Sequence, residues 1–124
     1  MDILSSRLLL HPRDLAASQR FYRDILGLAV YREFAAGLVF FLGNGLLEVS
    51  GHGSEGSPGG LELWLQVRDV GAEHTRLAAL GVPVLRAPQL EPWGLIEMWI
   101  ADPDGVRIVL VQVPPDHPLR RDQR

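Results

Sequence analysis

Two glutamates of this chain fall in strand-like segments where they would share a face with aromatic or polar side chains. Residues 61–67 have aliphatic side chains at odd positions, and their even positions carry Glu62, Trp64 and Gln66. Because successive side chains of a strand point to opposite faces, this pattern predicts a strand with one apolar and one polar face. The same rule places Glu48 opposite its apolar neighbours Leu47 and Val49. Carboxylates so placed are candidates for general bases or for ligand contacts.

An arginine and a histidine are predicted on a similar face near the N-terminus. In residues 7–11 the side chains of Arg7, Leu9 and His11 share one side of a short apolar strand. His11 could act as an acid or a base, although a lone histidine is more often structural or exposed. Trp93, between a proline and a glycine, is expected on the rim of a cavity, whereas Trp99 is expected in the core.

These segments belong to two copies of one unit. The triplet Arg-Asp-Leu at 13–15 returns as Arg-Asp-Val at 68–70, and Leu-Gly at 26–27 returns at 80–81. The repeat makes Arg7 and Glu62 equivalent, since each lies seven residues before the aspartate of its triplet. The stretch 107–111 corresponds to the segment around Glu48 and contains no acidic residue.

Each copy has the element order β-α-β-β-β. Asp14 and Asp69 are predicted helix caps, and Gly27 and Gly81 are predicted helix ends. Unit one spans about residues 5–50 and unit two about 61–113. The predicted strands are 7–11, 28–33, 38–42 and 46–50 in unit one and 61–67, 82–86, 95–101 and 106–113 in unit two. We expect an α+β fold in which both units form a curved, largely antiparallel eight-stranded sheet with helices on the outer face.

The segments outside the units are predicted to lack regular structure. Residues 51–60 contain five glycines and are expected to form a flexible linker. A phosphate-binding loop is the alternative, but the run does not end in Lys-Ser/Thr and opens onto a strand. The arginine-rich tail at 114–124 is interpreted as a solvated terminus or, alternatively, a basic segment that binds a partner.

Length and composition exclude several protein classes. The chain has 124 residues, enough for one domain, with 47% hydrophobic and 22% charged residues. No apolar run is long enough to cross a bilayer, and no secretory signal is recognisable, so we expect a cytoplasmic protein. Cysteine is absent, which excludes disulfides and thiolate chemistry. The net charge of -3 does not favour nucleic acid or anionic lipid and would favour a cationic guest only weakly.

The combination of motifs resembles the vicinal oxygen chelate superfamily, which contains glyoxalase I, bleomycin-resistance proteins, fosfomycin-resistance transferases and extradiol dioxygenases. The resemblance covers about residues 5–113. It rests on the paired β-α-β-β-β units, the helix opening at 14–22 (DLAASQRFY), the Leu-Gly-Leu helix end at 26–28 and the Asp-Pro-Asp-Gly turn at 102–105. It implies a homodimer, or a pseudo-dimer of units, with a ligand cavity inside each curved sheet.

Family enzymes bind a divalent metal through the first and fourth strands of each unit. Carried over by position, these ligands would be Arg7, Glu48, Glu62 and Val109. Arginine has no lone pair to donate to a metal, and valine has no polar atom. Three interpretations stay open: an internal ion pair of Arg7 with Glu48 or Glu62, direct contact of this cluster with a ligand, or a metal site completed by His11 or water.

We therefore predict a small-molecule binding protein of the glyoxalase and bleomycin-resistance type, without metal or cofactor. The alternatives are a metal-dependent lyase or dioxygenase of the same superfamily, and a metal-free lyase with a glutamate as general base. The candidate catalytic residues are Glu48 and Glu62. The candidate ligand-binding residues are Arg7, His11, Glu48, Glu62, Trp64, Gln66 and Trp93.

Overall fold

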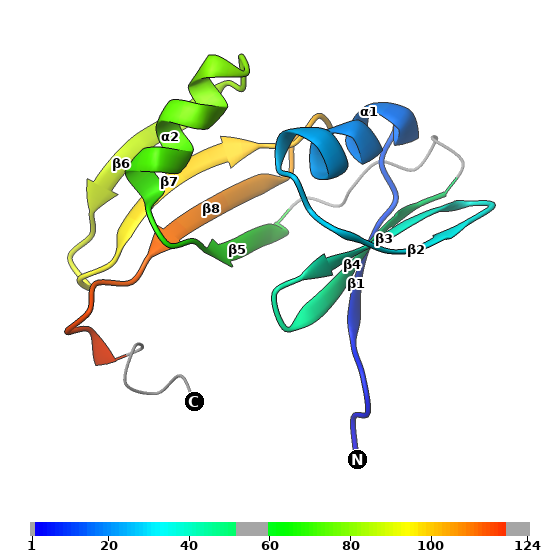
Figure 1. Ribbon diagram of the computed structural model, residues 1–124, viewed down its shortest axis with the longest axis horizontal. Helices are drawn as coiled ribbons and strands as arrows, with labels where there is room; N and C mark the ends of the chain where they lie inside the picture. Colours follow the sequence, from blue (N-terminus) through cyan, green and yellow to red (C-terminus); the bar gives the residue numbers. More distant parts are fainter. Residues whose placement is uncertain (1, 52–59, 119–124) are drawn as a thin grey trace. The chain divides into compact units, whose positions relative to one another are not determined.

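The computed structural model describes residues 2–51 and 60–118. They form two compact units (Figure 1), one from the N-terminal half together with the turn Asp102–Gly105, and one from the rest. Residues 52–59 of the predicted linker and 119–124 of the predicted tail lie outside the described residues. Within the described ranges, no helix has the length and apolar character that a membrane crossing requires.

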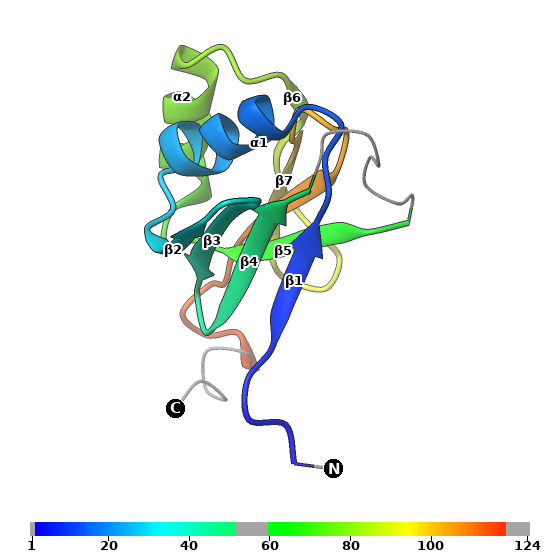
Figure 2. The same ribbon diagram turned by 90° about the vertical axis from the view of Figure 1, so that its right-hand side faces the viewer.

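The first unit is a four-stranded sheet with one helical segment. Its elements are β1 (Arg7–Leu10), α1 (Leu15–Arg20), the π-helical segment η1 (Phe21–Ile25), β2 (Val30–Phe34), β3 (Gly37–Leu42) and β4 (Gly45–Ser50). The strand order is β1-β4-β3-β2 (Figure 2). The β1–β4 pair is parallel and the other pairs are antiparallel.

The second unit repeats this plan. Its elements are β5 (Glu62–Gln66), α2 (Val70–Ala79), β6 (Val84–Leu90), β7 (Ile96–Ala101) and β8 (Arg107–Gln112). The strand order is β5-β8-β7-β6, again with one parallel pair, β5–β8. The α+β class and the two β-α-β-β-β units are thus confirmed, with the eight strands hydrogen-bonded as two sheets of four.

The repeat extends to caps and irregularities. Asp14 and Asp69 each accept a hydrogen bond from the backbone N–H three residues later, at 3.0 Å. Gly27 and Gly81 follow the helices with φ of 74° and 79°, a conformation that glycine adopts without strain. The pairing of β2 with β3 and of β6 with β7 shifts register at the equivalent places, after Val30 and after Val84.

Two elements differ from the prediction. The first helix changes from α to π geometry at Phe21, where Phe21 and Tyr22 are both buried. Strand β6 continues to Leu90, beyond the predicted end at residue 86, and includes Pro88. Proline cannot donate to a ladder, and β6 tolerates it as an edge strand whose register shifts between Arg86 and Gln89.

Each sheet has a helix-covered face and an open face. In the first unit α1 packs on β3 and β4, and in the second α2 packs on β6, β7 and β8. The covered faces hold the buried strand side chains Phe40, Leu47, Val49, Met98 and Ile100, and Leu77 of α2 is buried as well. The opposite faces, to which the alternation rule assigned the candidate residues, are called the open faces below.

Candidate functional site

An ion pair joins the first and fourth strands on the open face of the first unit. In the parallel β1–β4 ladder Leu9 lies opposite Glu48, and Arg7 precedes Leu9 by two residues on the same face. The Arg7 Nη1 donates to Glu48 Oε1 at 2.9 Å. Of the two glutamates proposed as partners of Arg7, the structure selects Glu48.

A serine and a histidine complete this group. Ser50 Oγ donates to Glu48 Oε2 at 2.8 Å, so both oxygens of the carboxylate have donors. His11 Nδ1 lies 3.1 Å from the Ser50 carbonyl oxygen and is placed to donate to it. The hydrogen bond from Ser50, followed by that from Arg7, holds the pKa of Glu48 below its usual range. Glu48 is therefore an anion at neutral pH and a weak base.

The second unit has an ion pair at the corresponding end of its parallel ladder, with the charges exchanged. Glu62 on β5 lies directly opposite Arg107 on β8, and Arg107 Nη2 donates to Glu62 Oε1. Both side chains are more than 40% exposed, 43% for Glu62 and 42% for Arg107. Water screens such a pair, so it contributes little to stability.

Trp99 lies next to this pair in the middle of the open face. It is carried by β7, between Arg86 on β6 and Arg107 on β8. The guanidinium carbons of these arginines lie 3.9 Å and 4.6 Å from the centroid of the Trp99 ring. Trp99 also packs against a buried cluster of Leu95, Val109, Val111 and Val113. The expected packing role of Trp99 thus holds, but on the open face.

The remaining candidates also belong to the second unit. Trp64 lies opposite Val109 on β8 and is 51% exposed, and Gln66 follows it on the same face. Trp93 lies in the loop between β6 and β7, 58% exposed, and its indole Nε1 donates to Glu97 Oε2 at 2.8 Å. The candidates therefore form two groups, Arg7, His11 and Glu48 in one unit and Glu62, Trp64, Gln66 and Trp93 in the other.

Three contributors to these groups were missed from the sequence: Ser50, Arg86 and Arg107. Strand alternation could have found Ser50, because it puts residues 48 and 50 on one face, and Gly37 leaves room for it, since a Cβ at residue 37 would lie 2.6 Å from the Ser50 Cβ. Arg107 was detectable from the repeat, because a parallel first and fourth strand puts it opposite Glu62. No sequence signal tied Arg86 to Trp99.

The positions that hold metal in related enzymes do not fit a divalent cation here. Arg7 places a positive charge against Glu48 and has no lone pair, and Val109 is a buried apolar side chain. Across residues 2–51 and 60–118, no three histidine, aspartate or glutamate side chains gather as a metal site requires. The donor set thus disagrees with the metal centre that the resemblance implies.

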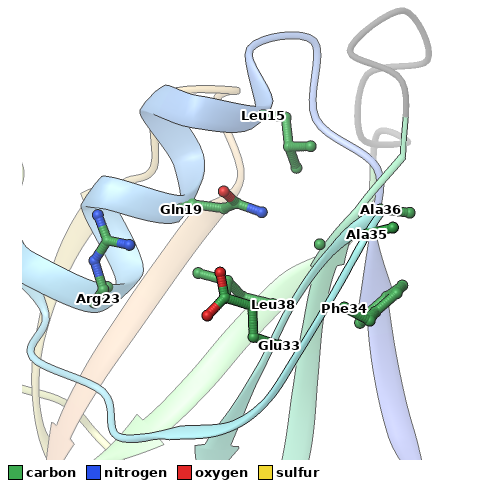
Figure 3. Close-up of a pocket in the computed structure, with 9 residues that line it drawn as sticks. Leu15, Gln19, Arg23, Glu33, Phe34, Ala35, Ala36 and Leu38 are labelled. Carbon is green, nitrogen blue, oxygen red and sulfur yellow. The ribbon is translucent and has the colours of Figure 1, made fainter.

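A small cavity lies elsewhere in the first unit, between its helix and the β2–β3 hairpin (Figure 3). Its volume is about 190 Å³, and its lining includes Gln19, Arg23, Glu33 and Leu38. None of the predicted site residues lines it. It is therefore separate from both groups of candidate residues.

Comparison with solved structures places this fold among glyoxalase-related proteins. The chain is similar to a lactoylglutathione lyase from Agrobacterium tumefaciens, with 23% identity and a TM-score of 0.72 over 90% of this chain and 94% of that chain. A glyoxalase-related enzyme from Fulvimarina pelagi gives 25% identity and 0.73 over 92% and 90%. A superfamily member from Sphaerobacter thermophilus gives 19% identity and 0.72 over 90% and 98%. No curated protein matches the chain.

The family assignment rests on the sequence as well as on the fold. The profile of the Glyoxalase/Bleomycin resistance protein/Dioxygenase superfamily matches residues 6–110, a range that covers most of both units and includes both ion pairs. With the repeated β-α-β-β-β architecture, this match establishes that the chain belongs to the Glyoxalase/Bleomycin resistance protein/Dioxygenase superfamily.

Proposed function

We propose that this protein binds a small molecule on the open faces of its units, in the cavity of a homodimer, without a divalent metal. The observation that carries the proposal is the pair between Arg7 Nη1 and Glu48 Oε1 at 2.9 Å, at positions where related enzymes hold metal ligands. A guanidinium is a permanent cation, so it supplies the positive charge that a metal would otherwise bring to Glu48.

The size of this interaction supports the exchange of a metal for an arginine. At about 4 Å and an effective dielectric constant near 20, two unit charges attract by about 4 kcal/mol before the cost of desolvation. The Glu48 side chain is only 14% exposed, so water screens the pair less than it screens Glu62 and Arg107. Removing Arg7 would leave a largely buried carboxylate with Ser50 as its remaining donor.

The open face of the second unit carries aromatic and polar side chains of its own that suit ligand contacts. Trp64 offers an exposed indole on the same face as Glu62 and Gln66, and such surfaces stack planar ligands. Trp93 is exposed in the neighbouring loop, with its indole nitrogen directed to Glu97. His11, held to the Ser50 carbonyl, flanks the Arg7 group in the first unit.

The enzymatic alternatives receive less support. A metal-free lyase needs a general base, and the lowered pKa of Glu48 makes that carboxylate a weak one at neutral pH. A metal-dependent lyase or dioxygenase needs ligands that Arg7 and Val109 do not provide.

Ligand binding can be tested through the tryptophans. The intact protein is titrated with a panel of antibiotics and planar small molecules, and both tryptophan fluorescence and thermal unfolding are followed, since a ligand of the folded state raises the unfolding temperature. Trp64→Ala is expected to abolish the fluorescence response and the thermal shift. Leu80→Ala, which changes an equally exposed side chain at the end of α2, is the control and should leave both unchanged.

The same titrations decide against the proposal in two ways. Stabilisation by nickel, zinc, manganese or ferrous iron that Glu48→Gln removes would favour the metal-dependent alternative. Turnover of a panel compound that Glu48→Gln or Glu62→Gln abolishes would favour a lyase. The dimer is checked by sedimentation equilibrium, in which a monomer at all concentrations would contradict it.

A further inference from the structure

Both open faces present an arginine whose guanidinium is only partly used by the protein. From this we propose that the ligand is an anion, a carboxylate or another planar oxyanion that takes the free donors of Arg7 in one unit or, separately, those of Arg107 in the other. This inference rests on the proposed function and adds the chemical class of the ligand. The negative charge proposed for the ligand is opposite to the weak preference for a cation that the net charge of -3 predicts.

The hydrogen bonds of Arg7 leave most of its donors available. A guanidinium carries five N–H donors, and Glu48 accepts one of them, from Nη1. The pair is one-pronged, since Glu48 accepts from Arg7 through Oε1 while its Oε2 accepts from Ser50 Oγ at 2.8 Å. The Arg7 side chain is 31% exposed while its glutamate partner is 14% exposed. A solute that reaches this group therefore meets the cation more readily than the anion.

Arg107 shows the same incomplete use in the second unit. Its Nη2 donates to Glu62, and its guanidinium lies over Trp99, 4.6 Å from the ring centroid. These two contacts fix the group, so less conformational entropy is lost when a ligand binds. The side chain is 42% exposed, and the exposed indole of Trp64 lies on the same face.

Carboxylate geometry suits these arginines. The free N–H groups of a guanidinium form a planar fork that matches the two oxygens of a carboxylate, and such charge-assisted bonds are stronger than neutral ones. A cationic ligand that approached Glu48 would be repelled by Arg7, a permanent cation whose Nη1 lies 2.9 Å from Glu48 Oε1. Because the side chain of Arg7 is more exposed than that of its partner Glu48, an oxyanion is the favoured class at this pair.

Three probes of almost the same shape test the sign of the charge: benzoate, benzamide and benzamidine, which are anionic, neutral and cationic at pH 7. Each is titrated into the intact protein, with binding followed by nuclear magnetic resonance of the arginine Nε–H and tryptophan indole N–H groups. We expect benzoate to bind at least about tenfold more tightly than benzamide, and benzamidine to bind most weakly, with shifts at Arg7, Arg107 and Trp64.

Variants assign the effect to the two arginines. Arg7→Gln and Arg107→Gln are each expected to weaken benzoate binding about tenfold and to leave benzamide binding unchanged. Arg23→Gln, which removes an exposed arginine paired with Asp24 on the helix, is the matched control and should leave benzoate binding unchanged. Arg7→Gln also leaves Glu48 without its cationic partner. The double variant Arg7→Gln/Glu48→Gln removes both charges of the pair and should show the same loss of benzoate binding.

The outcomes separate this inference from the proposed function. Benzamidine or benzamide binding at the open faces as tightly as benzoate would overturn the anion preference and leave small-molecule binding intact. Benzoate binding that survives both arginine substitutions would also overturn it. If none of the three probes binds, the inference fails, and the broader panel described above decides the proposed function.

Discussion

The two units have the same architecture but place their paired charges on opposite strands. In the first, arginine is on the first strand and glutamate on the fourth, whereas in the second glutamate is on the first strand and arginine on the fourth. Both pairs join the two parallel strands on the open face. In the first pair Glu48 is largely buried and also accepts a hydrogen bond from Ser50. In the second pair both side chains are exposed, and the Arg107 guanidinium lies over the Trp99 ring.

The comparison shows that fold and charge order are separate properties of this architecture. Caps, helix ends and register shifts recur in both units, while the side chains at the ends of the parallel ladders do not. Burial then determines which pair affects stability, because an exposed pair is screened by water. The following substitutions test these differences.

The largest effect is expected in the second unit, at Trp99. Replacing it with alanine removes packing against the apolar cluster and leaves Arg86 and Arg107 without their aromatic contact. Trp99→Ala should lower the free energy of unfolding by about 3 kcal/mol, measured by urea denaturation. Trp64→Ala on the same face is the control, and its exposed ring should cost less than about 1 kcal/mol. Equal losses would mean that Trp99 is not a packing residue.

A second difference lies under the first helix. The residue eight positions after the helix cap is Tyr22 in the first unit and Leu77 in the second. Both side chains are fully buried. The Tyr22 hydroxyl donates to Asp102 Oδ2 at 2.7 Å, a bond that Leu77 cannot make. Tyr22→Phe should therefore lower the free energy of unfolding by about 2 kcal/mol at pH 7. A loss below 0.5 kcal/mol, roughly the size expected for an exposed group, would contradict this role.

Alkaline pH tests the same tyrosine. Burial, and then the charge of Asp102, raise the pKa of Tyr22 far above its usual value near 10. Unfolded chains ionise this phenol above about pH 10 while the folded protein keeps its proton, so stability is present below that pH and falls as pH rises. Urea denaturation at pH 7 and pH 11 should show a smaller fall for Tyr22→Phe than for the wild type.

The smallest effects separate the two ion pairs. Glu48→Gln should lower the free energy of unfolding by about 1 kcal/mol at pH 7, whereas Glu62→Gln should cost less than about 0.5 kcal/mol. The pKa of Glu48 is lowered on folding, so its stabilisation is present above the usual glutamate value and is lost as pH falls through the folded pKa. Glu48→Gln should therefore flatten the acid side of the stability profile. If Glu48→Gln left the dependence of stability on acid pH unchanged, the lowered pKa assigned to Glu48 would be contradicted.

Local rules predicted the elements and faces of this protein well. Asp14 and Asp69 cap helices as expected, and the alternation of Glu62, Trp64 and Gln66 gave the correct open face. These features depend on neighbours in sequence. The π-helical segment after Arg20 and the extension of β6 through Pro88 were missed, because tertiary packing and an edge position decide them.

The side-chain partners were harder to predict than the faces. Arg7 had two candidate acids, and its choice of Glu48 follows from a diagonal reach across one parallel ladder. Arg107 was not predicted as the partner of Glu62, because the repeat aligns Val109, and not Arg107, with Glu48. Partner choice depends on the reach and rotamers of long side chains, which strand periodicity does not specify.

Metal titration tests whether Arg7 takes the place of a metal ligand. Nickel is titrated by calorimetry into chelator-treated wild type, Arg7→His and, as a matched control, Arg23→His. We predict no binding heat for the wild type or for Arg23→His, and measurable affinity for Arg7→His, since a histidine beside Glu48 restores a donor of the kind metals prefer. One equivalent of nickel bound by the wild type and lost in Glu48→Gln would contradict the account.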